Sequence, residues 1–106
     1  MMRAHKFHAV ATTVDGHRFP SKKEARRFAE LKLLERAGKI SRLTLQPSYT
    51  FTHNGVEICR YVADFQYFDN DRNCPVTEDS KGVKTPAYII KSKLLKAFYG
   101  IEVLET

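Results

Sequence analysis

Residues 58–68 constrain the fold most, because their side chains change character at every second position. One face carries mostly large apolar side chains, namely Cys59, Tyr61, Ala63, Phe65 and Tyr67. The opposite face is more polar and consists of Arg60, Val62, Asp64 and Gln66. A period of two residues is typical of a β-strand that buries one face. The sequence therefore predicts a sheet with residues 58–68 as its clearest strand.

Helix signals lie on both sides of this strand. The motif Ser-Lys-Lys-Glu at residues 21–24 has the form of a capping box, and Gly38 is a natural stop, so we expect a first helix between them. Thr85 followed by Pro86 predicts the start of a second helix, which is expected to end at Gly100.

Shorter extended segments complete the pattern. They are a hairpin over residues 9–19 that turns at Asp15-Gly16, and strands over residues 43–51, 76–81 and 101–104. Gln46-Pro47 interrupts the first of these strands, which predicts an edge position or a bulge. After the hairpin the order is α-β-β-β-α-β, without linkers or internal repeats. We expect one α/β domain, residues 1–106, with a mixed sheet flanked by a helix on each side.

Composition and charge narrow the class of protein. The net charge of +6 favours a polyanionic partner. Nucleic acid is preferred over an anionic membrane, because no lipidation motif or basic amphipathic anchor is evident. No apolar run approaches the roughly 20 residues that cross a bilayer, and no signal peptide is recognised. Cys59 and Cys74 do not form a disulfide framework, so we expect a cytoplasmic protein.

The strand predicted over residues 76–81 conflicts with its expected place inside the sheet. Its sequence is Val-Thr-Glu-Asp-Ser-Lys, whereas an interior strand is normally apolar on at least one face. Such conflicts tend to mark functional positions. Strand periodicity places Asp79 and Lys81 on one face. Asp64 lies beside them if this strand pairs with the preceding one through the intervening turn.

Two carboxylates and a lysine that converge at strand ends suit phosphodiester hydrolysis. The carboxylate oxygens of Asp64 and Asp79 are suitable ligands for Mg²⁺ or Mn²⁺, which also take up phosphate oxygens of a substrate. Such a metal polarises the phosphate and lowers the pKa of a bound water. Lys81 is expected to orient that water and to offset negative charge that develops during the reaction.

Several short motifs occur in a fixed order over residues 6–104. They are Ser-Lys-Lys-Glu-Ala at the start of the first helix, Gln-Pro, Tyr-Val-Ala-Asp-Phe, Glu-Asp-Ser-Lys-Gly, and Thr-Pro at the start of the second helix. This ordered set resembles the PD-(D/E)XK nuclease superfamily, and within it a small phage-encoded branch. Ala63 stands where the name-giving motif has proline.

The resemblance implies a restriction-endonuclease-like core and a Mg²⁺- or Mn²⁺-dependent DNA endonuclease. It implies that Asp64 and Asp79 bind the metal and that Lys81 is catalytic. Glu24 is at the position of a first-helix glutamate that supplies a further metal ligand in the superfamily. The expected substrates are duplex or branched DNA, as in phage DNA processing and recombination.

Some roles stay open from the residues alone. Glu24 is either only a helix cap or also a metal ligand, and Glu30 is the alternative ligand on the same helix. Asp64 has the plainer alternative of facing solvent, and Asp79 and Lys81 have that of forming a cross-turn salt bridge or an exposed edge. Glu78 is expected to point away from Asp79 and to be structural, unless a bulge reverses the two.

Candidate nucleic-acid contacts occur on both expected helices and between strands: Lys22, Lys23, Arg26, Arg27, Gln46 and Lys91. Cations at a helix start oppose the helix dipole, which an acidic partner would explain, although a solvated face is the simpler alternative. Gln46 has the alternative of bonding a buried backbone group. Lys91 has the alternative of reaching solvent from the margin of the core.

Three wider questions also stay open. A homodimer would let so small a chain cut both strands of a duplex. A non-catalytic nucleic-acid-binding module that keeps the fold is the rival from another class of protein. An RNA-directed nuclease would share the metal centre and differ in its substrate groove.

Overall fold

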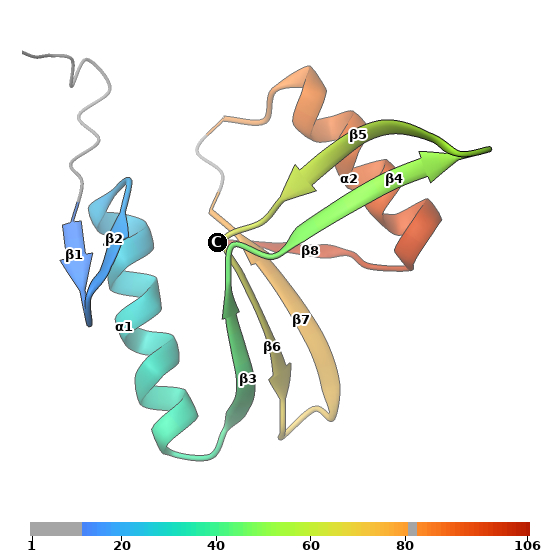
Figure 1. Ribbon diagram of the computed structural model, residues 1–106. Helices are drawn as coiled ribbons and strands as arrows, with labels where there is room; N and C mark the ends of the chain where they lie inside the picture. The colour runs from blue at the N-terminus through green and yellow to red at the C-terminus, as the bar shows by residue number, and fades with distance from the viewer. Residues whose placement is uncertain (1–11, 81–82) are drawn as a thin grey trace, which may run out of the picture.

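The described chain starts with a hairpin. The structure is a computed structural model that describes residues 12–80 and 83–106 (Figure 1). Strands β1 (Thr12–Val14) and β2 (His17–Phe19) pair in antiparallel fashion. Asp15 and Gly16 form the turn with φ values of 50° and 79°, a left-handed backbone that this residue pair tolerates well. The predicted hairpin is confirmed from Thr12 onward, and its first three positions lie outside the described residues.

Helix α1 (Lys22–Arg36) follows the hairpin directly. Its N-cap is Ser21, whose hydroxyl accepts a hydrogen bond of 3.2 Å from the Glu24 N–H. The helix ends just before Gly38, where φ is 77°. Phe28 and Leu31 are buried against the hairpin and the sheet. The cap and stop signals therefore predicted this helix correctly.

Two long antiparallel segments form the centre of the molecule. The first consists of β3 (Ile40–Leu45) and β4 (Ser48–His53), and the second of β5 (Val56–Val62) and β6 (Phe65–Asp69). β3 pairs with β6, and β4 pairs with β5. The paired strands β4 and β5 form an arm that projects from the rest of the protein (Figure 1).

The two segments bend at positions that lie opposite each other. At the bend the Gln46 N–H donates to the Asp64 carbonyl (2.9 Å), and the Ala63 N–H donates to the Pro47 carbonyl (3.0 Å). Gln46 has a φ of 48°, so the first segment turns sharply here. The interruption that Gln46-Pro47 predicted in the first segment is confirmed. The bend places Asp64 between two strands rather than within one.

The prediction of one continuous strand over residues 58–68 is wrong. Tyr61 and Ala63 pack in the cluster around helix α2 (Pro86–Tyr99), whereas Phe65 and Tyr67 pack in the cluster around α1. These four side chains alternate correctly but do not share one face, because the chain passes from one sheet to another at the bend. The strand predicted over residues 43–51 is divided in the same way.

A four-stranded sheet has the order β3-β6-β7-β8 and supports the rest of the fold. Strand β7 (Cys74–Asp79) runs antiparallel to β6 and parallel to β8 (Val103–Glu105). The predicted α/β class with a mixed sheet is therefore confirmed. The polar strand is interior, as predicted, although the structure begins it at Cys74 and describes it only to Asp79.

Helix α2 starts at the cap Thr85, whose hydroxyl accepts a hydrogen bond from the Tyr88 N–H, and ends at Gly100, where φ is 70°. It packs on the arm, whereas α1 packs beside the four-stranded sheet (Figure 1). Neither α1 nor α2, the helices of the described chain, has the length and apolar character that a bilayer crossing needs.

Candidate active site

The last three residues of β7 are polar and almost fully buried. The exposed fractions of Thr77, Glu78 and Asp79 are 3%, 0% and 2%. Because successive strand residues point to opposite faces, Thr77 and Asp79 lie on the side of the α2 cluster, and Glu78 lies on the side of α1. Buried polar groups are costly unless they are paired, so the partners of these side chains reveal their roles.

Glu78 is bound from the α1 side by a guanidinium and a hydroxyl. Arg27 Nε donates to Glu78 Oε1 (2.8 Å), and Arg27 Nη2 donates to Oε2 (2.6 Å). The Tyr67 hydroxyl donates to the same carboxylate. These hydrogen bonds to Glu78 raise the pKa of Arg27 above its ordinary value. Glu78 therefore points away from Asp79, as expected, and forms a buried, fully compensated ion pair.

Asp79 is held on the opposite side of β7. The Tyr61 hydroxyl donates to Asp79 Oδ2, and Tyr61 itself is buried. Burial and this hydrogen bond raise the pKa of the Tyr61 hydroxyl, so it remains a donor. The Asp79 carbonyl also accepts a hydrogen bond of 3.1 Å from the Thr106 N–H. The side chain and the backbone of Asp79 are thus both fixed.

Asp64 lies at the bend and is tied to the end of β7. Its backbone N–H donates to the Glu78 carbonyl (3.1 Å), and its Oδ2 accepts a hydrogen bond from the Ser80 N–H (2.7 Å). A strand residue in regular pairing would not have its side chain held by the neighbouring strand's backbone. The bend therefore brings the carboxylate of Asp64 next to that of Asp79.

The electrostatics of Asp64 show which carboxylates surround it. Burial is the main cause that raises the pKa of Asp64 to about 7. The hydrogen bond from the Ser80 N–H lowers this pKa, whereas the nearby carboxylates of Asp79 and Glu24 raise it further. Glu24 is 6% exposed on the first turn of α1. Glu24, Asp64 and Asp79 thus form an acidic cluster at the end of β7.

This acidic cluster fits a divalent cation by its donor chemistry. No group of three His, Cys, Asp or Glu side chains within residues 12–80 and 83–106 could hold a metal ion as it stands. Mg²⁺ commonly needs only one or two protein carboxylates, because waters and substrate phosphates fill its other positions. The adjacent Asp64 and Asp79 meet that requirement, and a cation would relieve their mutual repulsion. Lys81 lies outside the described residues.

The comparisons with known proteins identify a family but no activity. A family model described as "Protein of unknown function (DUF1064)" matches residues 4–104. The chain belongs to this family. No curated protein and no solved structure matches it.

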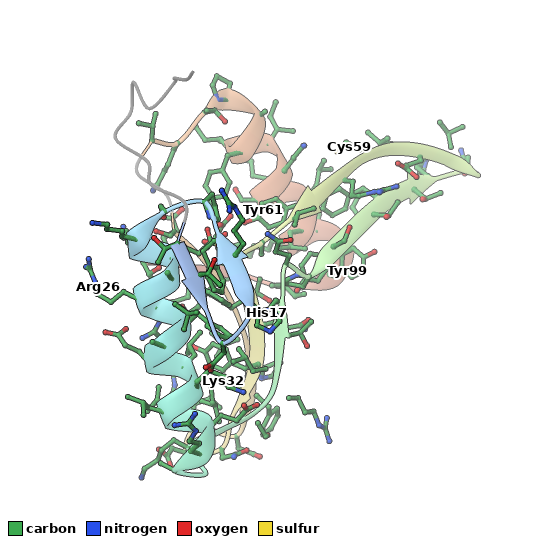
Figure 2. All side chains as sticks on the ribbon, turned by 60° about the vertical axis from the view of Figure 1, so that its left-hand side comes forward. His17, Arg26, Lys32, Cys59, Tyr61 and Tyr99 are labelled. Carbon is green, nitrogen blue, oxygen red and sulfur yellow. The ribbon has the colours of Figure 1, made fainter. Side chains whose placement is uncertain are left out.

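In this DUF1064 protein the predicted nucleic-acid contacts lie in different surroundings. Lys22, Lys23 and Arg26 are exposed on α1, and Figure 2 shows Arg26 pointing away from the protein. Arg27 is instead engaged by Glu78 and, at 3.2 Å, by Glu30.

The two remaining candidates lie near the bend and on α2. Gln46 is exposed at the bend, and Lys91 is half-buried on α2. Lys91 therefore does not belong to the basic group on α1.

Two tyrosines and one arginine have roles that the sequence did not predict. Tyr61 and Tyr67 were expected only as core side chains, whereas their hydroxyls bind Asp79 and Glu78. Arg27 was expected among the nucleic-acid contacts, whereas its guanidinium compensates a buried glutamate. The available signal was the occurrence of tyrosine, rather than phenylalanine, on both sides of Asp64.

Proposed function

We propose that this protein is a Mg²⁺- or Mn²⁺-dependent endonuclease that hydrolyses phosphodiester bonds in DNA, with a centre of the PD-(D/E)XK type. One observation carries the proposal: Asp64 and Asp79 adjoin each other at the end of β7, and Ser80 and Tyr61 each hold one of them in place. Buried carboxylates that lie side by side repel one another, so a cluster that is kept in fixed geometry favours a cation-binding role.

Each residue of the centre has a separate task in this proposal. Asp64 and Asp79 hold the cation, and Glu24 adds a carboxylate from α1. A bound cation polarises the scissile phosphate and makes its bound water a stronger nucleophile. Lys81 orients the attacking water and offsets the charge that develops on the phosphate.

The order of the elements supports the same assignment. If β3–β4 and β5–β6 are each counted as one bent strand, the chain after the hairpin reads α-β-β-β-α-β. That order is the one expected for a restriction-endonuclease-like core. The metal ligands then come from α1, from the bend directly before β6, and from the end of β7.

Charge favours a nucleic acid as the substrate. The chain has a net charge of +6, and Lys22, Lys23 and Arg26 are exposed on the helix that carries Glu24. These cations would contact the phosphate backbone without reading bases, and binding would weaken steeply with salt. A homodimer would place two such centres on one duplex or on a branched junction.

Isothermal titration calorimetry with Mg²⁺ and with Mn²⁺ tests the centre directly. We expect one cation site in the wild type and a large loss of affinity in Asp64→Asn and Asp79→Asn. Asp71→Asn is the matched control, because Asp71 is exposed in a turn and only weakly paired with Lys39 (3.8 Å). Absence of cation binding with nucleic acid present would overturn the proposal and favour a non-catalytic binding module.

A further inference from the structure

A groove of about 310 Å³ lies between β5 and the start of α2. Arg60 and Lys91 line it, together with Tyr61 and Tyr88. Figure 2 shows Tyr61 where the β4–β5 arm joins the rest of the protein. The groove thus lies where the arm meets α2, outside the proposed metal centre.

One of the residues that line the groove, Tyr61, also contacts the acidic cluster. The Tyr61 hydroxyl donates to Asp79, and the ring centroids of Tyr61 and Tyr88 lie 6.1 Å apart. The charge of Asp79 also contributes to raising the pKa of Tyr88, although burial is the main cause. Tyr61 therefore connects the groove to the carboxylate of Asp79.

The groove is cationic. Within residues 12–80 and 83–106, no acidic side chain lines it. Lys91 is half-buried and has no ion-pair or hydrogen-bond partner among the described residues. Among the residues that the structure describes, Arg60 is paired with Glu57 at 3.5 Å, and both side chains are more than half exposed (58% and 52%). No carboxylate of the described residues neutralises the Lys91 ammonium, and the exposed Arg60–Glu57 pair is easily exchanged, so both cations are available to an anion.

We propose that this groove binds the phosphate backbone of the nucleic-acid strand beside the bond that is cleaved, with Arg60 and Lys91 each contacting a phosphate. The inference rests on the proposed nuclease function. The positive end of the α2 dipole, at Thr85 and Pro86, adds to the field at the groove. Contact is to the backbone and not to bases, because Tyr61 and Tyr88 are only 4% and 6% exposed and offer no stacking surface.

Binding of a short fluorescein-labelled duplex, measured by fluorescence anisotropy in EDTA at several salt concentrations, tests the groove without cleavage. Arg60→Ala and Lys91→Ala should each weaken binding about threefold to tenfold. Each should also reduce the slope of log affinity against log salt by about 0.9. Lys93→Ala is the matched control, since Lys93 is exposed two positions further along α2 and does not line this groove, and it should leave affinity unchanged.

Lys91→Arg is the control for a purely structural effect. Because it keeps the positive charge, the slope of log affinity against log salt should return to the wild-type value. In cleavage assays with Mg²⁺, the alanine variants should raise KM and leave kcat within about twofold. If the wild type cleaves but both alanine variants bind with wild-type affinity and slope, the groove proposal is wrong and the nuclease assignment stands. If the wild type cleaves nothing but both variants lose affinity and slope, the groove stands and the catalytic assignment is wrong.

Discussion

The backbone N–H of Ser80 donates a 2.7 Å hydrogen bond to the Oδ2 atom of Asp64, which lies sixteen positions earlier in the chain. This contact links the bend of one segment to the end of the neighbouring strand. It fixes one oxygen of Asp64 and leaves the carboxyl group beside Asp79. The proposed centre therefore depends on the bend as much as on the acidic residues themselves.

Asp64→Asn should stabilise the protein above neutral pH when no metal is present. The pKa of Asp64 is raised from 3.8 to about 7, so between these values the folded chain holds a proton that the unfolded chain has lost. The free energy of unfolding of the wild type therefore falls as pH rises from about 4 to 7. Asparagine does not ionise and avoids this loss. We expect the variant to match the wild type near pH 4 and to exceed it by about 1 kcal/mol at pH 8, after allowance for solvent screening.

Chemical denaturation at several pH values measures this difference. A gap between the variant and the wild type that stays constant with pH would contradict the electrostatic explanation. Addition of Mg²⁺ should reverse the order at pH 8, because only the wild type gains stability from a cation that binds the folded state.

Tyr61→Phe should impair catalysis, because Asp79 would lose the hydroxyl that holds its Oδ2 atom. We expect kcat to fall about tenfold and the affinity for Mg²⁺ to fall by a similar factor, by analogy with losses of partners that orient metal ligands. Stopped-flow cleavage assays and calorimetry provide the two numbers. Unchanged kcat and unchanged cation affinity would show that Tyr61 serves only packing.

Tyr67→Phe is the matched counterpart on the other face of β7. Its hydroxyl donates to Glu78, which takes no part in the proposed centre. We expect a loss of about 1–2 kcal/mol in the free energy of unfolding and little change in kcat. A larger effect of Tyr67→Phe than of Tyr61→Phe on kcat would reverse our assignment of the two faces.

Arg27→Met should destabilise the fold by about 3 kcal/mol, because Glu78 is buried and would lose its counter-charge. Adding Glu78→Gln should recover part of this loss, which a double-mutant cycle by urea denaturation measures. Lys39→Ala is the control: its pair with Asp71 is exposed, and its removal should cost less than about 0.5 kcal/mol. Equal losses in the free energy of unfolding for the Arg27 and Lys39 substitutions would show that the buried pair contributes no more stability than the exposed pair.

The sequence predicted the helices well because their ends carry explicit local signals. Ser21 and Thr85 cap the two helices, and Gly38 and Gly100 follow them, as their residue types indicate. The opposite orientations of Glu78 and Asp79 also followed from strand periodicity alone. These inferences needed no knowledge of which elements pack together.

The bend was not predictable in the same way. Alternation of large side chains continues through Ala63 and Asp64, so the pattern gives no sign that the segment changes sheets there. Only Pro47, on the neighbouring segment, hinted at an interruption, and its effect on Asp64 arises from tertiary pairing. The hydroxyl roles of Tyr61 and Tyr67 were hidden for a similar reason, since a tyrosine in a strand is equally typical of ordinary packing.

The central claim is that Asp64 and Asp79 form a cation-dependent nuclease centre, and cleavage of nucleic acid tests it most directly. Purified wild type, Asp79→Asn and the control Asp71→Asn should be incubated with single-stranded, duplex, flapped and four-way-junction DNA and with RNA, each with Mg²⁺, Mn²⁺ or EDTA. We predict cation-dependent cleavage of at least one DNA by the wild type and by Asp71→Asn, and a loss of about 10³-fold in Asp79→Asn, which corresponds to about 4 kcal/mol. Cleavage that persists in EDTA or in Asp79→Asn, or its absence from every DNA, would contradict the claim.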